Sequence, residues 1–493
     1  MRKIFNFVLF AVLTASFAAH AQVERPKLVV GIVVDQMRWD YLYYYQPLFG
    51  EGGFKRLLDE GFSCQNTIID YVPTVTAVGH ASIFTGSTPA AHGIAGNDYM
   101  IDGSSVESVD DYQVSGVGTK GKIGRRSPRN LLTTTIGDEL RAATSFKSKV
   151  VGIALKDRAA ILPAGHSANA AYWYDAKLPG FITSTYYMDR LPQWVVKQNE
   201  AFGRNPQAKS AATSQLGITF TFSMAKEAIT AERLGQGEAT DMLTVSVSST
   251  DIVAHRQGTR SAQVDSCYRT LDRELASFFT TLDEKVGKGR YLVFLTADHG
   301  GTNNFKYNHS HKLPTGAWSY WNTDNTDYNK VLKAKFGVDS LVKDVKEYSL
   351  YIDEARVRSH RLCRDSVVAA VKAYFEADPS VERLVDIENM ASDPIPAELK
   401  ERIVKGYYRG RSGELFIMLK PGRYCGEADA DGSNHGTWSM DDSHIPCLLM
   451  GWGVKHGETM QRTGIIDIAP TICSMLHIQM PSGCLGTPIS ALF

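Results

Sequence analysis

Four short runs of apolar, mostly β-branched residues constrain the fold of this 493-residue chain most strongly. The runs are Leu28–Val34, Lys149–Leu155, Leu243–Val247 and Tyr291–Thr296. Apolar and polar residues do not alternate in them, so we expect strands that are buried on both faces, as in a parallel sheet covered by helices. Each run is followed by a polar cluster and then by a helical pattern. The sequence therefore predicts an α/β fold with a doubly wound, mostly parallel sheet flanked by helices.

The start of the chain has the pattern of a secretory signal peptide. Arg2 and Lys3 precede an apolar run over residues 4–17, and residues 19–21 read Ala-His-Ala, which is an A-x-A cleavage site. The run is shorter than the roughly 20 residues that a membrane-spanning helix needs. We therefore expect a signal peptide over residues 1–21, a mature chain that begins at Gln22, no membrane anchor, and a periplasmic or secreted protein.

The charge balance of the chain bears on nucleic acid as a possible partner, and the cysteine content bears on disulfides. The chain has 53 Lys and Arg residues against 53 Asp and Glu residues, so we expect no dedicated nucleic-acid partner.

Seven cysteines in an exported chain allow up to three disulfides. Cys473 and Cys484 are close in sequence, and we expect them to pair. Cys267 lies within apolar residues at helical spacing, which indicates a buried core residue or a helix-face thiol.

Metal-ligating side chains follow the apolar runs. In open α/β sheets, ligands bind beyond the carboxyl ends of the strands, and five of six candidate residues are expected there. Asp251 and His255 are four residues apart, so a helix would place them on one face. Taken singly, each candidate favours a structural role: Asp35 or Asp251 could cap a helix, and a lone histidine is usually a core or surface residue. Together they favour a two-metal site. The candidates are Asp35, Asp251, His255, Asp298, His299 and His435.

The stretch "PTVTAVGHASIFTGSTPAAHG", residues 73–93, holds the candidate nucleophile. A hydroxyl is a weak nucleophile until a cation or a helix N-terminus stabilises its alkoxide. Thr76 fits, because the ten residues after it are compatible with a helix packed through small side chains. Residue type alone does not exclude three other hydroxyls, and Thr76 could instead be a plain helix N-cap. The rivals are Thr74, Ser82 and Thr85.

Five motifs resemble those of the alkaline phosphatase superfamily. They are "GIVVDQMR", "PTVTAVGHASIFTGSTPAAHGIAGN", "SSTDIVAH", "TADHGG" and "NHGTW". The chain is most similar to the threonine-nucleophile branch, which includes the type I phosphodiesterase/nucleotide pyrophosphatase proteins and the PafA-like alkaline phosphatases. The resemblance implies one catalytic domain over residues 22–493, with an alkaline phosphatase-like sheet and a cap insertion at about 302–411.

The resemblance also implies roles for single residues. Two Zn²⁺ ions would be held, one by Asp251, His255 and His435, the other by Asp35, Asp298 and His299. Thr76 would be the nucleophile and would contact the second zinc. Asn97 matches a side-chain amide that hydrogen-bonds a phosphoryl oxygen, although a simple turn asparagine would also fit its "GN" context.

Lys156 and Arg158 favour phosphate monoesters over diesters. They come after a predicted strand and are two residues apart, so we expect both side chains on one face. Two cations match the two unesterified terminal oxygens that are left on a monoester, and arginine can bind them in a bidentate way. PafA-like phosphatases carry a similar Lys-x-Arg, whereas phosphodiesterase relatives usually lack it. The alternative interpretation is a solvated strand end.

The sequence therefore predicts a zinc-dependent phosphomonoesterase that acts through a phosphothreonine on small-molecule phosphate monoesters, and we expect a monomer. Two alternatives stay open: a phosphodiesterase/nucleotide pyrophosphatase, and a binding protein that keeps the fold without turnover. The other histidines are not expected to be metal ligands. His80, His92 and His166 are expected to support or pack against motif residues, and His309 and His311 to face substrate or to be structural.

Overall fold

The computed structural model describes residues 24–318, 327–427 and 430–493. The expected signal peptide and the expected mature start at Gln22 lie outside these ranges. Among the described residues, no helix combines the length and the apolar character needed to cross a membrane.

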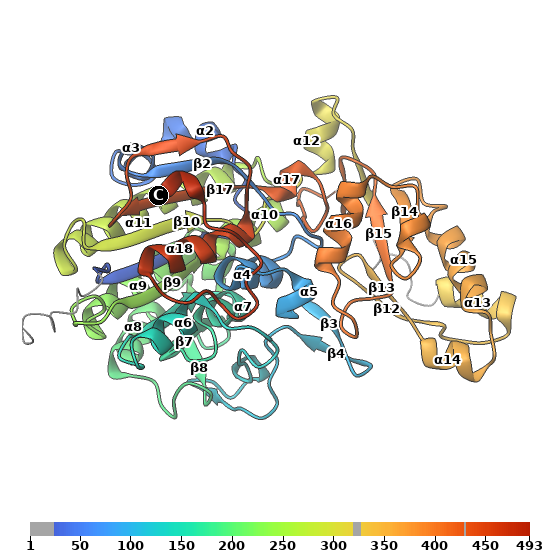
Figure 1. Ribbon diagram of the computed structural model, residues 1–493, viewed down its shortest axis with the longest axis horizontal. Helices are drawn as coiled ribbons and strands as arrows, with labels where there is room; N and C mark the ends of the chain where they lie inside the picture. The colour runs from blue at the N-terminus through green and yellow to red at the C-terminus, as the bar shows by residue number, and fades with distance from the viewer. Residues whose placement is uncertain (1–23, 319–326, 428–429) are drawn as a thin grey trace, which may run out of the picture.

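An 11-stranded sheet forms the centre of the molecule (Figure 1). Its five middle strands, β10-β1-β9-β6-β7, are all parallel, and antiparallel pairs follow on both sides. The strand order is β18-β2-β17-β10-β1-β9-β6-β7-β8-β5, with β19 paired to β2. This arrangement confirms the expected mostly parallel α/β fold. The strands are β1 (Leu28–Val34), β2 (Phe62–Ile68), β5 (Gly116–Val117), β6 (Val150–Ala154), β7 (Ala170–Asp175), β8 (Gly180–Ser184), β9 (Asp241–Val247), β10 (Tyr291–Thr296), β17 (His444–Gly451), β18 (Gly457–Thr459) and β19 (Thr463–Gly464).

The four apolar runs of the sequence are β1, β6, β9 and β10, and all their residues are buried. Burial of every residue requires cover on both faces of the sheet. Two groups of packed helices provide it. One group is α4 (Thr76–Thr85), α6 (Ile136–Ala143), α7 (Asp157–Ala164) and α18 (Ile468–Leu476); the other is α3 (Phe54–Glu60), α8 (Gln193–Gly203), α9 (Leu216–Ala231), α10 (Ser249–Gln257) and α11 (Ala262–Lys285).

The register of the parallel strands brings their carboxyl ends to one edge. Val34 of β1 pairs with Val247 of β9, and Ala154 of β6 pairs with Ser246. On the other side of β1, Val33 pairs with Thr296 of β10. The chain segments that leave β1, β6, β9 and β10 therefore start side by side, at the position where ligands bind in open α/β sheets.

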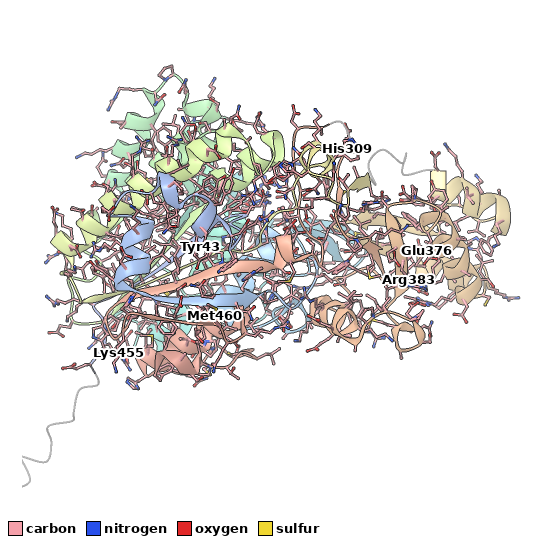
Figure 2. The ribbon with its side chains drawn as sticks, turned by 90° about the horizontal axis from the view of Figure 1, so that it is seen from above. Tyr43, His309, Glu376, Arg383, Lys455 and Met460 are labelled. Atoms are coloured by element: carbon pink, nitrogen blue, oxygen red, sulfur yellow. The ribbon has the colours of Figure 1, made fainter. Side chains whose placement is uncertain are left out.

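A second, smaller unit lies beside the main sheet, coloured yellow to orange in Figure 1. Its four-stranded sheet has the order β12-β13-β15-β14 and only antiparallel pairs, and it encloses its own hydrophobic core. Figure 2 shows Glu376 and Arg383 in this unit. The elements are α13 (Asp327–Phe336), β12 (Val342–Lys346), β13 (Ser349–Ile352), α14 (Glu354–Ser359), α15 (Arg364–Phe375), β14 (Val381–Asp386), α16 (Ala397–Gly406) and β15 (Leu415–Leu419).

Smaller elements join the two units. The hairpin of β3 (Asp98–Ile101) and β4 (Ser104–Glu107) follows α5 (Pro89–His92), and α16 packs against α5. β11 (Gly316–Trp318) pairs with β16 (Arg423–Cys425). The hydrophobic core of the second unit includes residues of β15 and Cys425. Both come after Arg411, where the insertion expected from the sequence ends.

The cysteines differ from the prediction. Cys473 and Cys484 both carry free thiols, so the expected disulfide between them is wrong. Cys473 lies in α18 with its side chain in the core, and Cys484 lies in the following loop. Cys267 is fully buried in α11, as its helical surroundings predicted.

Candidate active site

Thr76 lies where the chain enters α4, and it is the first residue of that helix. The N-cap is Val75, so the side chain of Thr76 does not serve as the cap. Its Oγ1 accepts a hydrogen bond from Lys156 Nζ at 3.2 Å, and the residue lines a pocket of about 280 Å³. The free N–H groups of the first helical turn favour a negative charge at this position.

The three rival hydroxyls point elsewhere. Thr74 Oγ1 donates to the carbonyl of Thr437 at 2.9 Å, and Thr85 Oγ1 donates to that of Ala81 at 2.7 Å. Ser82 Oγ lies 3.1 Å from His92 Nε2. All three are fully buried. Only Thr76 among the four candidates faces the pocket.

One set of converging donors comes from α10 and from the loop that carries His435. His255 Nε2 lies 3.1 Å from Asp251 Oδ1, and His435 Nε2 lies 3.5 Å from the same oxygen. The two Nε2 atoms are 3.2 Å apart. Asp251 and His255 share one face of α10, one turn apart, as their spacing predicted.

The second set comes from the ends of β1 and β10. His299 Nε2 lies 3.5 Å from both Asp35 Oδ1 and Asp298 Oδ2. All three atoms are buried. Asp35 Oδ1 and His299 Nε2 have no hydrogen-bond partner among the described residues, and outside this set Asp298 Oδ2 lies near the His80 ring. One ligand atom each from Asp35, Asp298 and His299 fits within 4.8 Å, and so does a group of Asp251, His299 and His435. His299 therefore lies between the two sets, and we place it with Asp35 and Asp298 because His255 completes the other set at shorter distance.

The histidine rings are oriented to present Nε2 as a lone-pair donor to a cation. Nδ1 of His255, His299 and His435 lies 2.8–3.0 Å from a backbone carbonyl, of Ser433, Gly300 and Thr74 respectively. In that tautomer Nδ1 carries the proton, and Nε2 is left as an acceptor. Two acceptor nitrogens 3.2 Å apart beside a carboxylate repel one another, and a shared divalent cation removes this repulsion. The donor sets therefore fit metal ions.

The pKa shifts of the buried groups differ from one candidate ligand to the next. Burial lowers the pKa of His255, but the Asp251 carboxylate outweighs burial and raises it, so a bound cation would replace a proton there. Burial, followed by the charges of Asp251 and Asp298, raises the pKa of Asp35 well above its usual range. Burial also lowers the pKa of His299 and His435, which keeps both rings in the neutral form that binds metal. A nitrogen and oxygen donor set of this kind suits zinc.

Lys156 and Arg158 reach the pocket by a different route from the one expected. They are not on one strand: β6 ends at Ala154, Lys156 is the N-cap of α7, and Arg158 lies in its first turn. Both residues line the pocket. Lys156 Nζ lies 2.6 Å from the carboxylates of Asp35 and Asp251. Burial lowers the pKa of Lys156, but these two carboxylates outweigh it and hold the pKa above its usual value.

Asn97 lines the same pocket as these cations. Its Oδ1 accepts a hydrogen bond from the Ala77 N–H at 2.9 Å, so the carbonyl end of the amide is fixed at the start of α4. The pocket is also lined by Ile252 and Arg256, on the exposed side of α10, which the sequence did not single out. No motif marks these two, and only the position of α10 relative to Thr76 places them here.

Gln36 is another residue that the sequence did not single out. Its Nε2 donates to Asp251 Oδ1 at 2.7 Å, and its N–H donates to Asp298 Oδ1 at 3.2 Å. It therefore bridges the two donor sets. The only sequence feature that could have pointed to Gln36 is its position directly after the candidate ligand Asp35.

The other histidines divide between support and surface. His80 Nδ1 lies 3.2 Å from Asp298 Oδ2, so it contacts a candidate ligand as expected. His92 contacts Ser82, and His166 Nε2 lies 3.2 Å from the carbonyl of Thr133. His309 and His311 are exposed on and just after α12 (Phe305–Ser310), and Figure 2 shows His309 at the surface.

Comparisons with known proteins give a family model and several relatives. Residues 29–441 match the family model of type I phosphodiesterase / nucleotide pyrophosphatase. The chain is 43% identical to alkaline phosphatase PafA of Elizabethkingia meningoseptica, over 98% of each chain. It is 42% identical to a Myroides odoratus protein named calcium-transporting ATPase, over 98% of this chain and 96% of that one. A crystal structure of PafA superposes with a TM-score of 0.90 over 95% of this chain and 99% of that chain.

Proposed function

The chain belongs to the type I phosphodiesterase / nucleotide pyrophosphatase family, and on that premise we propose that it is an alkaline phosphatase-type enzyme that hydrolyses phosphate monoesters. The observation that carries this proposal is the pocket in which Thr76, Asn97, Lys156 and Arg158 meet. A hydroxyl beside three phosphate-binding side chains fits a transferred phosphoryl group with two free anionic oxygens.

Two zinc ions are proposed as cofactors. Asp251, His255 and His435 would hold one, and Asp35, Asp298 and His299 the other, with Thr76 Oγ1 beside the second set. When bound, such a metal pair lowers the pKa of a coordinated hydroxyl and neutralises charge on the reacting oxygens. The support is the convergence of two sets of side chains. Asp35, Asp298 and His299 form one set, and His255 and His435 lie within 3.5 Å of Asp251 in the other.

The chain's own residues would carry out two displacements. Thr76 Oγ1 loses its proton and attacks the phosphorus atom, so that an O–P bond forms and the ester O–P bond breaks. The leaving oxygen takes up one proton and departs as the alcohol. Water then attacks the phosphothreonine, restores the Thr76 hydroxyl and releases inorganic phosphate. Lys156, Arg158 and Asn97 would bind the non-bridging oxygens, and the loss of one such donor costs on the order of 3–4 kcal/mol of barrier.

Export to the periplasm or the medium belongs to the same proposal. The support is the signal-peptide pattern of residues 1–21. N-terminal sequencing of the protein isolated from its own host should begin at Gln22. A chain that retains Arg2 and Lys3 would contradict cleavage at Ala21.

The test compares kcat/KM for an aryl phosphate monoester and for the matching diester with zinc-loaded protein. The same pair is measured for a Lys156→Ala, Arg158→Ala double variant. We expect the monoester to dominate in the wild type, and the double variant to lose mainly that preference, because the diester has less charge for the cations to bind. A dominant diester rate would replace this proposal with the phosphodiesterase activity named in the family description.

A further inference from the structure

A strained turn from the second unit reaches the site. β12 ends at Lys346 and β13 begins at Ser349, and these two residues pair, so Glu347 and Tyr348 alone form the hairpin turn. Their φ angles are +45° and +71°. Such a turn requires left-handed backbone at both positions and favours Asn-Gly, whereas Glu and Tyr are disfavoured there. Non-glycine residues in this conformation cluster at functional sites.

Glu347 contacts Asn97, the proposed phosphate-binding amide. Its Oε2 accepts a hydrogen bond from the backbone N–H of Asn97 at 2.7 Å. The approach is close enough that a Cβ on Gly96 would lie 2.5 Å from the same Oε2. The carboxylate is therefore built tightly against the Asn97 loop.

Asn97 is thereby held from two sides. The Ala77 N–H donates to its Oδ1 at the start of α4, and the Glu347 carboxylate accepts its backbone N–H. Because Oδ1 is bonded to Ala77, the two hydrogens of the amide nitrogen remain for a ligand in the pocket that Asn97 lines. The backbone that carries this carboxamide is held by a residue 250 positions away in the chain.

The same turn contacts the loop of a candidate metal ligand. Tyr348 Oη donates to the His435 carbonyl at 3.1 Å and accepts from Cys425 N–H at 3.2 Å. A Cβ on Gly436, which has φ +104°, would clash with the Tyr348 ring. The turn therefore meets both the Asn97 loop and the His435 loop.

We propose that Glu347 is a positioning residue for phosphoryl transfer, which aims the Asn97 amide into the pocket from the second unit. This inference rests on the proposed function. It gives the insertion a role in the reaction, because its hairpin turn supplies one side of the clamp on Asn97.

A double-mutant cycle tests this role. We expect Glu347→Ala to lower kcat/KM for an aryl phosphate monoester about tenfold in the wild type, and to have almost no effect in an Asn97→Ala background. Residues that act as a unit are non-additive in this way. Glu347→Gln keeps an acceptor oxygen and should recover part of the loss. An equal factor in both backgrounds, or no loss in the wild type, would overturn the inference.

Two variants separate positioning from folding. Glu347→Gly removes the carboxylate and also the strained Cβ, so we expect lost activity with an unchanged or raised Tm. The matched control is Glu414→Ala, which removes another partly buried glutamate of the second unit, one that accepts the Ile352 N–H at 2.8 Å. It should leave kcat/KM unchanged. If the Glu347→Gly loss of activity only accompanies a lowered Tm, Glu347 is structural and the inference fails.

The same double-mutant cycle can be measured as binding of inorganic phosphate to the zinc-loaded variants, by calorimetry. This measurement does not depend on whether the enzyme prefers monoesters or diesters. Coupling between Glu347 and Asn97 in phosphate binding, combined with dominant diester hydrolysis, would overturn the proposed function and keep the positioning role. Additive effects in an enzyme that prefers monoesters would overturn the positioning role alone.

Discussion

At the scale of single residues, Thr76 is distinguished from its neighbours by what its oxygen faces. Thr74, Ser82 and Thr85 have their hydroxyls bonded inside the protein, whereas Thr76 Oγ1 faces Lys156 and the pocket. Sequence alone left all four open. The four hydroxyls differ in the direction of their side chains around α4. That direction depends on the residue at which the helix begins.

We predict that Thr76→Ala lowers kcat for a monoester by on the order of 10⁴-fold or more, because no nucleophile remains. Zinc content, measured by mass spectrometry, should stay unchanged, since six other side chains can hold the metals. The control is Thr85→Ala in the same helix, which should retain near-normal turnover. Near-normal activity of Thr76→Ala would refute the nucleophile assignment.

Asp442 gives a prediction for pH. It accepts hydrogen bonds from Thr437 and Thr302, yet burial raises its pKa to about 7. Between about pH 4 and pH 7 the folded protein then holds a proton that the unfolded chain has released. The stabilisation by Asp442 is present below this window and is lost as the pH rises through it.

The measurement for Asp442 is the free energy of unfolding against pH in wild type and Asp442→Asn. The wild type should lose stability relative to the variant by up to about 1.4 kcal/mol per pH unit between about pH 4 and pH 7. Parallel curves would show that Asp442 stays ionised in the folded protein throughout this range.

At the scale of elements, α4 is positioned by a close approach at Gly79. A Cβ at this residue would clash with the backbone carbonyl of Asp298, which cannot move aside as a flexible side chain can. The small residues of α4 thus bring Thr76 and the candidate ligand Asp298 together. The sequence indicated a helix packed through small side chains, but not the element against which it packs.

We predict that Gly79→Ala destabilises the protein by about 1–3 kcal/mol, as overpacking does, and lowers zinc affinity by displacing Asp298. Urea unfolding and zinc titration measure the two effects. The matched control is Gly203→Ala at the end of α8, where a Cβ meets nothing within 4 Å. It should be neutral or slightly stabilising. Equal behaviour of the two variants would contradict the packing argument.

At the scale of the whole molecule, two hydrophobic cores meet at one site. The main core supplies the strand ends, and the second core supports the hairpin that carries Glu347 and Tyr348. Further contacts join the units, among them an ion pair between Lys405 of α16 and Asp70 and a hydrogen bond from the Val72 N–H to the carbonyl of Arg402. The site therefore depends on how the units sit together.

Metal removal tests the molecule as a whole. We predict that a chelator abolishes monoester hydrolysis and lowers the Tm by several degrees, because a ligand at a thousandfold excess over its Kd stabilises the folded state by about 4 kcal/mol. Added Zn²⁺ should restore both. Hydrogen exchange should rise mainly at the ends of β1 and β10 and stay unchanged within β14 and β15. An unchanged Tm after complete chelation would contradict the two-metal site.

The sequence by itself determined the central strands, a helix in the stretch after Thr76 and the six candidate ligands. Strands buried on both faces must be apolar throughout, and polar residues directly after such strands meet at one edge of a parallel sheet. These patterns are local, so they can be read without knowing the tertiary contacts. The resemblance of five motifs to a known superfamily supplied the division of these six residues between two metal ions.

Only the tertiary structure decided how the remaining groups meet. Lys156 and Arg158 enter through the first turn of α7, not along a strand, and Arg256 and Glu347 join the site through packing between elements far apart in the chain. Cys473 and Cys484 are close in sequence and remain unpaired. The physical reason is that a local pattern sets which face of an element is buried, whereas contacts between distant elements depend on how whole units pack.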